Sequence, residues 1–309
     1  MWDIEDCILD YSGINLFKHQ GLVSFPRSIT EIVRLSPHKF VNAANRIRGT
    51  GCSTNLSSVP RDKENLIVTM NLNRVDFIGE GLIRCQAGVQ VGVLQHYLSS
   101  LGWQLPVVNS GYAIGPSLGG YFMAGGIGEG SRVYGGFWTN VDSINWLDLE
   151  TYQTMRIDQS NRRFWQLSGS GAKSPETGLI IDLDLKIIPI ETGVHYPGGL
   201  SKQLEWKYLH TNQPHTIFMT AFISAKMANK LFKTFKDHIG AFVNSWDNLA
   251  YRSMGIRNHS LKCPDFLNHL EGDLIAFSIG GELKNPRYHH AKLICETFSQ
   301  IVYSFDDCV

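Results

Sequence analysis

Residues 105–136, with the sequence LPVVNSGYAIGPSLGGYFMAGGIGEGSRVYGG, decide our interpretation of the fold. This glycine stretch is far richer in glycine than the whole chain, which has 30 glycines among 309 residues. Glycine weakens helices and strands alike, so such a density is expected where the backbone approaches a neighbour very closely, such as a ligand lying along the chain. We therefore predict that the stretch is a binding surface made of main chain.

A second, shorter loop has the same character. It has the sequence RGTGCSTN over residues 48–55, and it follows residues 40–47, which we expect to lead into the first parallel strand. Backbone amides next to glycine, together with serine and threonine hydroxyls, form an anion-binding nest that suits a phosphate or pyrophosphate. The alternative is a plain surface turn, because short glycine-rich loops are common.

The composition favours a packed globular protein and excludes some partners. Hydrophobic residues make up 43% of the 309 residues, and a chain of this length favours two domains with separate cores. The formal net charge is zero and the isoelectric point is near 7.2, so no overall positive field attracts nucleic acid or anionic lipid. We expect no nucleic-acid partner, and no apolar run approaches the length of a membrane span.

The cysteines and the N-terminus indicate a cytoplasmic protein without a metal. The six cysteines are scattered and show neither a Cys-x-x-Cys pair nor a zinc-type Cys/His cluster. The acidic start, MWDIED, lacks the basic and apolar regions of a secretory signal. We therefore expect reduced thiols and no metal site.

Hydrophobic periodicity predicts a mixture of helices and strands before Pro189. The expected helices cover residues 25–35 and 91–101, with a helical turn at 161–167. One or two short strands are expected within residues 1–24. Further strands are expected at 66–70, 75–78, 82–88, 141–149, 154–157 and 178–189, and the pair at 141–149 and 154–157 resembles a hairpin.

The composition changes after Pro189. Two similar units follow a linker, each a strand and then a helix: 216–224 with 225–242, and 274–283 with 288–303. This order suggests a small α+β domain with its helices on one face of an antiparallel sheet. We therefore divide the chain into a domain at residues 1–190 and a cap domain at residues 191–309.

Several interpretations of the glycine-rich loops compete. A Rossmann fingerprint through Gly126, Gly128 and Gly130 lacks the flanking strand and helix it requires. A P-loop is excluded because no Gly-Lys-Ser/Thr sequence occurs. A third interpretation is that the glycines only permit tight backbone packing. A fourth combines both loops with the strand at 178–189.

The motifs of the fourth interpretation follow one another along the chain in the same order as in a known family. Residues 22–190 resemble the FAD-binding domain of the vanillyl-alcohol oxidase/p-cresol methylhydroxylase (PCMH-type) flavoproteins, which include cytokinin dehydrogenases and decaprenylphosphoryl-ribose oxidase. The resemblance rests on these elements: the helix at Pro26, RGTGCS at 48–53, QAGV at 86–89, GWQLP at 102–106, SLGG at 117–120, GGIG at 125–128, YG at 134–135, Asn161 with Phe164-Trp165, and GLII at 178–181.

The resemblance implies an α+β fold in which a PCMH-type FAD domain of two packed sheets carries a small cap. It also implies which residues hold the cofactor. The pyrophosphate would lie on Gly49, Thr50, Gly51, Cys52, Ser53, Thr54, Ser117, Gly119 and Gly120. The ribityl chain and ring would lie along Gly125, Gly126, Gly128 and Ser131, and the adenine near Gly178 and Ile180.

The sequence departs from the family at the positions that matter for catalysis. Many members carry a flavin-linking histidine where this chain has Cys52, so we predict non-covalent FAD; a cysteinyl link is the alternative. Cytokinin dehydrogenases have a basic aspartate at the position of Tyr112, and many relatives have a histidine near the position of Tyr134. We take Tyr134, Tyr112 and His195 as the catalytic candidates.

The resemblance implies oxidation of a small alcohol or amine by hydride transfer to the flavin, followed by reoxidation with oxygen or a protein acceptor. The cap is short for the family, since only about 120 residues follow Pro189, so a partner subunit could complete the pocket. The main alternative is a flavin-binding subunit or accessory protein with little catalysis of its own. An NADPH-dependent reductase is another, for which we find no dinucleotide site.

Overall fold

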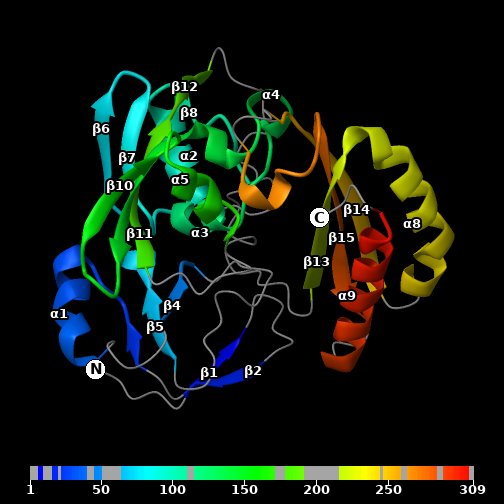
Figure 1. Ribbon diagram of the computed structural model, residues 1–309, viewed down its shortest axis with the longest axis horizontal. Helices are drawn as coiled ribbons and strands as arrows, with labels where there is room; N and C mark the ends of the chain where they lie inside the picture. The colour runs from blue at the N-terminus through cyan, green and yellow to red at the C-terminus, as the bar shows by residue number, and fades with distance from the viewer. Residues whose placement is uncertain are drawn as a thin grey trace.

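The computed structural model describes eleven segments of the chain: residues 6–9, 16–19, 22–39, 45–50, 64–109, 115–170, 178–190, 216–243, 246–258, 263–283 and 288–305. These segments form three main sheets with helices packed on them, and Figure 1 shows the overall arrangement. The fold is α+β, as the sequence predicts.

A sheet of five strands, here the large sheet, is the centre of the N-terminal part. Its order is β10 (Thr154–Asp158), β9 (Val141–Asp148), β11 (Gly178–Lys186), β7 (Leu82–Gln86) and β6 (Val75–Gly79), with every neighbour antiparallel. The predicted hairpin of β9 and β10 is confirmed. Strand β11 joins the two hairpins at the centre of the sheet, and it is buried along almost its whole length although it carries Asp182 and Asp184.

One face of the large sheet carries the main core. Buried side chains at alternate positions of β7, β9 and β11, such as Ile83, Ile144 and Leu183, point to this face. Helices α2 (Val91–Ser100), α3 (Leu118–Met123) and α5 (Arg162–Leu167) cover it with Leu94, Phe122 and other apolar residues. The helix predicted at 91–101 is therefore confirmed.

A second sheet is parallel and is linked to the first by its own apolar cluster. Its order is β3 (Val23–Ser24), β5 (Asn65–Val68) and β4 (Asn45–Arg48), so the strand before the Arg48 loop is parallel, as predicted. Helix α1 (Ile29–Lys39) packs Ile32 against Ile67 of β5 and against Leu179 of β11. The two sheets are thus packed together, as the resemblance implies.

Helix α1 begins with a capping arrangement of two side chains. Ser28 Oγ accepts a hydrogen bond from Glu31 N at 3.2 Å, and Glu31 Oε2 accepts one from Arg27 N at 2.7 Å. These two side chains satisfy amides that the first helical turn leaves without a partner.

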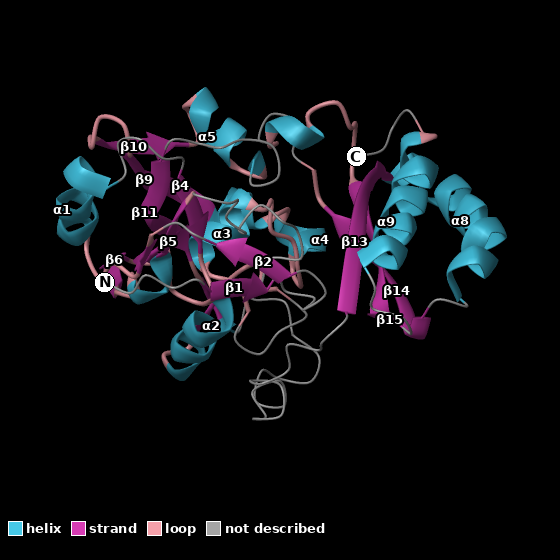
Figure 2. Ribbon diagram, turned by 90° about the horizontal axis from the view of Figure 1, so that it is seen from below, coloured by secondary structure: helices cyan, strands magenta, loops and turns pink. Residues whose placement is uncertain are grey.

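The C-terminal sheet has the order β13 (Thr216–Ser224), β15 (Leu274–Leu283) and β14 (Trp246–Ile256), and all its pairings are antiparallel. Helices α8 (Ala228–Val243) and α9 (Tyr288–Tyr303) pack on the face turned away from the N-terminal part, as both ribbon views show (Figures 1 and 2). The predicted strand-helix units are confirmed. The sequence did not reveal β14, whose polar and small residues give little alternation.

Short elements complete the described chain. They are the antiparallel hairpin β1 (Asp6–Leu9) with β2 (Leu16–His19), the pair β8 (Trp103–Gln104) with β12 (Ile188–Pro189), helix α4 (Ser131–Tyr134), and 3-10 turns η2 (Thr69–Asn71), η3 (Phe137–Asn140), η6 (Ala225–Met227) and η7 (Asp265–Leu267). Within the described segments, no helix has the length and apolar character required to cross a membrane.

The main core does not stop at residue 190. Ile256, Leu267, Leu274 and Ala276 belong to the same buried cluster as the large sheet, whereas α8 and α9 form a separate cluster with the other face of the C-terminal sheet. The predicted division at residues 190 and 191 therefore stays a proposal, and the two parts share apolar contacts across it.

Candidate functional site

The two glycine-rich loops, which are far apart in the sequence, lie against each other in the structure. A β-carbon built on Gly49 would collide with Ser117 Oγ, so only glycine fits there. Thr50 Oγ1 also donates a hydrogen bond to Gly115 O at 3.4 Å. Gly49 therefore lies against the Ser117 side chain and Thr50 against the backbone of Gly115, on loops that we predicted to bind one pyrophosphate.

Three of the quoted motifs are joined by backbone hydrogen bonds beside these loops. Gly119 N donates to Ala87 O at 2.9 Å, and Ala87 N donates to Ile181 O at 2.8 Å. Leu118 N donates to Val89 O at 2.8 Å. The motifs at 86–89, 117–120 and 178–181 thus meet in one place, although they are separated by tens of residues in the chain.

Ser117 begins helix α3, and its hydroxyl has a defined role there. The side chain is buried, and its Oγ accepts a hydrogen bond from Gly120 N at 3.4 Å. The amides of residues 118–120 are thus engaged within the protein, which leaves side-chain hydroxyls as the donors at this point. A hydroxyl that accepts one hydrogen bond can still donate its proton to a phosphate oxygen.

The glycines that follow α3 make room for the protein's own atoms. A β-carbon on Gly126 would collide with the ring of Tyr121, and one on Gly128 with the carbonyl oxygen of Val108. Gly130 has φ +91°, and a β-carbon there would meet Pro106 O. Tight packing therefore accounts for much of the glycine content that we attributed to a ligand.

Ser131 lies at the start of α4 and is completely buried. Its Oγ accepts a hydrogen bond from Gly128 N at 3.0 Å, and its carbonyl oxygen accepts one from Arg257 N at 3.0 Å. In this arrangement Ser131 holds the turn around Gly128 together. Its predicted contact with the flavin, and those of Gly125, Gly126 and Gly128, stay predictions.

The residues predicted near the adenine begin strand β11. Gly178 is buried, and a β-carbon on it would collide with Leu147 O and with the ring of Trp146. Ile180 has only 4% of its surface exposed and belongs to the main core. The strand end is therefore close-packed, and contact of an adenine with its backbone stays a prediction.

Of the catalytic candidates, only Tyr134 lies within the described residues. Its side chain is half-buried against the main core, and its carbonyl oxygen accepts a hydrogen bond from Thr139 Oγ1 at 2.5 Å. Tyr112 and His195 lie outside the described residues, as do Gly51, Cys52, Ser53 and Thr54 of the Arg48 loop.

A charged cluster, which the sequence analysis did not single out, lies on the polar face of the large sheet. Its members are Arg84, Ser143, Arg156, Asp182 and Asp184. Asp184 is 1% exposed and binds Arg84 through two hydrogen bonds of 2.7 and 2.9 Å, Arg156 through one of 2.5 Å, and Ser143 Oγ at 3.2 Å.

The two carboxylates of this cluster have opposite pKa shifts. Burial acts to raise the pKa of Asp184, but the hydrogen bonds and charges of Arg84 and Arg156 outweigh it and lower that pKa. Burial raises the pKa of Asp182, although Asn145 donates a hydrogen bond of 2.6 Å to it. Because Asp184 is saturated with partners, the cluster is a structural ion-pair network rather than a source of acid or base.

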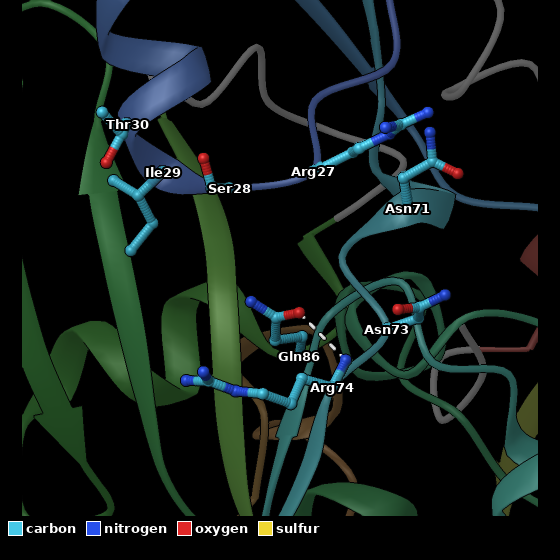
Figure 3. A pocket seen from close by; sticks show the side chains of 8 residues that line it. All are labelled: Arg27, Ser28, Ile29, Thr30, Asn71, Asn73, Arg74 and Gln86. Carbon is cyan, nitrogen blue, oxygen red and sulfur yellow. Dashed lines mark hydrogen bonds between the residues drawn. The ribbon is translucent and has the colours of Figure 1, made fainter.

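A separate pocket of about 550 Å³ opens beside the start of α1. Polar side chains make up most of its lining, as Figure 3 shows: Arg27, Ser28, Ile29, Thr30, Asn71, Asn73, Arg74 and Gln86. Gln86 Oε1 accepts a hydrogen bond from Arg74 N at 2.9 Å across its floor. The pocket contains none of the predicted site residues.

Comparison with protein families matches residues 22–151 to the FAD binding domain family. No curated protein sequence matches the chain. Among solved structures, the chain is similar to a chitooligosaccharide oxidase, with a TM-score of 0.50, 15% identity, and coverage of 99% of this chain and 55% of that chain. It is also similar to BBE-like 1 from Physcomitrella patens, with a TM-score of 0.50, 15% identity, and coverage of 88% and 51%.

The structure of berberine bridge enzyme from Eschscholzia californica also matches, with a TM-score of 0.47, 16% identity, and coverage of 93% of this chain and 50% of that chain. For the chitooligosaccharide oxidase and BBE-like 1, identities of 15% indicate a shared fold and nothing finer. The chain spans about half the length of the solved structures it matches.

Proposed function

We propose that this chain, whose residues 22–151 match the FAD binding domain family, is an FAD-dependent oxidoreductase that oxidises a small alcohol or amine. The observation that carries the proposal is the meeting of motifs 86–89, 117–120 and 178–181 beside the Gly49 loop. Bound FAD would supply the hydride acceptor, and the residues of the chain would hold and orient both the cofactor and the substrate.

The residues of the loop junction fit the pyrophosphate in the middle of this cofactor. A pyrophosphate needs hydrogen-bond donors and a close approach of the backbone. Thr50 and Ser117 each supply a hydroxyl on the two loops that meet here, and Gly49 leaves no β-carbon between the loops. We propose that these three residues, with Gly51, Cys52, Ser53, Thr54, Gly119 and Gly120, bind the pyrophosphate, and that the flavin is not covalently attached.

We propose that the substrate binds between the FAD domain and the C-terminal sheet, for which we keep the domain division at residue 190. The face of this sheet that carries Phe222 and Ala276 packs into the main core. One cross-strand pair further along the same face, Thr220 and Ser278 have hydroxyls 2.9 Å apart, and Thr220 is exposed. This pair offers donors and acceptors to a hydroxyl or amino group.

Tyr134, Tyr112 and His195 are the side chains that we propose to act at the reacting centre. Tyr134 suits a hydrogen bond to the substrate or cover for the ring, because it is half-buried at the edge of the glycine stretch. Oxygen or a protein acceptor would reoxidise the flavin. A cytoplasmic location stays a prediction that fractionation of the source cells would test.

The alternative function is that of a flavin-binding subunit with little catalysis of its own. The residue Tyr112 favours it, because cytokinin dehydrogenases have a basic aspartate at this position. In that case a partner subunit would complete the pocket.

The test is a sequence of two spectroscopic measurements on the purified chain. Titration with FAD should produce the absorption spectrum of a bound flavin, and a protein that binds no FAD would refute the proposal. A panel of small alcohols and amines should then bleach the flavin under anaerobic conditions. A flavin that no substrate bleaches supports the subunit alternative, and bleaching by NADPH alone would indicate a reductase.

A further inference from the structure

One aromatic ring from the C-terminal part lies in a socket made by two glycines of the N-terminal part. Phe266, in turn η7 between β14 and β15, packs directly on Gly125 and Gly169. A β-carbon on Gly125 would lie 2.7 Å from the Phe266 ring, and one on Gly169 would collide with it. Any other residue at either glycine would therefore displace the ring.

Both socket glycines also have a backbone conformation that favours glycine. Gly125 has φ +66° and Gly169 has φ +75°. The two positions are joined by a hydrogen bond network through α3, because Gly125 N donates to Phe122 O at 3.0 Å and Gly169 N donates to the same oxygen at 3.2 Å. The socket is thus fixed to the helix that begins at Ser117.

The ring of Phe266 contacts both parts of the molecule. It packs edge-on against Trp138 of η3, with ring centroids 6.4 Å apart, and against Phe222 of β13, with centroids 5.6 Å apart. Edge-to-face aromatic pairs of this kind are favourable and depend on orientation. Phe266 therefore links the glycine stretch to the face of the C-terminal sheet that carries Thr220 and Ser278.

A second contact lies at the other end of the same junction. Arg257 N, just after β14, donates a hydrogen bond to Ser131 O at 3.0 Å. Gly135 has φ +80°, and a β-carbon there would lie 3.1 Å from Arg257 O. Gly135 thus leaves room for the backbone of Arg257, just as Gly125 and Gly169 leave room for the Phe266 ring.

We propose that Phe266, seated between Gly125 and Gly169, is a positioning residue that sets where the C-terminal sheet lies over the flavin. The glycine stretch then has a second task besides the cofactor, because it is the seat of the C-terminal part. The statement that the sheet lies over the flavin rests on the proposed function, whereas the statement that Phe266 holds the junction does not.

The experiment compares Phe266→Ala and Gly169→Ala with the control Gly102→Ala. Gly102 has φ +80°, but no atom lies within 4 Å of its β-carbon position, so alanine there imposes a similar backbone strain without a collision. Hydrogen exchange of residues 254–258 reports the junction without any cofactor, because the amide of Arg257 is part of it.

We expect exchange at residues 254–258 to be roughly tenfold faster in Phe266→Ala and Gly169→Ala, and unchanged in Gly102→Ala. With FAD bound, iodide should quench the flavin more strongly in the two socket variants, while the apparent FAD affinity stays within about twofold of the wild type. Phe266→Leu, which refills part of the socket, should restore most of the protection.

Exchange at residues 254–258 that matches the control in both socket variants would overturn the proposal. Faster exchange with unchanged iodide quenching would also overturn it, because Phe266 would then stabilise the fold without positioning the sheet over the flavin. If Gly169→Ala does not fold, Phe266→Ala carries the test. A wild-type protein that binds no FAD would refute the proposed function instead. The exchange result would then still test whether Phe266 holds the junction.

Discussion

The glycine stretch and the charged cluster of the large sheet both join segments that are far apart in the sequence, but by opposite means. In the glycine stretch, missing side chains let backbone, rings and loops approach, as where Gly128 meets Val108 O. In the charged cluster, long side chains reach across strands to one carboxylate, Asp184. A close-packed glycine therefore tolerates no added atom, whereas the stability of the charged cluster depends on pH and on each charged partner.

The largest effect should come from adding one methyl group to the glycine stretch. In Gly128→Ala the new β-carbon would collide with a backbone oxygen, which cannot swing aside as a side chain does, so we expect a loss of about 3 kcal/mol in the free energy of unfolding. Urea unfolding would measure it. Gly102→Ala, in open space, should lose only about 1 kcal/mol, and equal losses would contradict the role of close packing.

A smaller loss is expected in the charged cluster. Asp184→Asn removes the charge that Arg84 and Arg156 share, and we expect a loss of about 2 kcal/mol, less than for a fully buried ion pair because both arginines are partly exposed. Asp237→Asn, an exposed aspartate of α8 outside the cluster, is the control and should change stability little. If Asp184→Asn left the free energy of unfolding unchanged, the network would add nothing to stability.

The same cluster predicts how stability depends on pH. The folded pKa of Asp184 is lowered, so its contribution is present above the ordinary aspartate pKa and is lost as the pH falls through the folded value. The difference between wild type and Asp184→Asn should therefore shrink below a pH of about 4. Because the pKa of Asp182 is raised, Asp182 changes the pH dependence of stability in the opposite direction. Unfolding curves of both proteins across this range would show a constant difference if Asp184 were not involved.

The smallest effect concerns the hydroxyl where the two loops meet. Ser117→Ala removes the cap of α3 and should reduce stability by about 1 kcal/mol. If Ser117 also binds the pyrophosphate, FAD affinity should fall roughly fivefold. Ser28→Ala removes the equivalent cap of α1, away from the loops, and should leave FAD affinity unchanged. Equal FAD affinities of Ser117→Ala and Ser28→Ala would show that Ser117 does not bind the pyrophosphate.

Local sequence signals predicted most elements of the fold. The apolar stripe of α2 and the alternation of apolar and charged residues in β11, from Ile181 to Lys186, each have a periodicity that belongs to one type of element. Strand β14 escaped prediction because its residues do not alternate clearly, and its place is decided by pairing along the whole length of β15.

The candidate site was predicted in part. The order of the motifs indicated an FAD-binding domain, and residues 22–151 match that family. The physical reason that we gave for the glycines was incomplete, because Gly126, Gly128 and Gly178 are required by contacts with Tyr121, Val108 and Leu147. A single sequence does not show which distant atom lies opposite a glycine.

By itself, the sequence indicated the α+β class, the hairpin of β9 and β10 and the match to the FAD binding domain family, because periodicity and turns are local properties and the motifs follow one order along the chain. Only the tertiary structure decided that Phe266 occupies the Gly125 and Gly169 socket, and that Arg84 and Arg156 converge on Asp184. Such contacts arise when separated segments pack against each other, and the space or charge that each leaves for the other is a property of the folded chain.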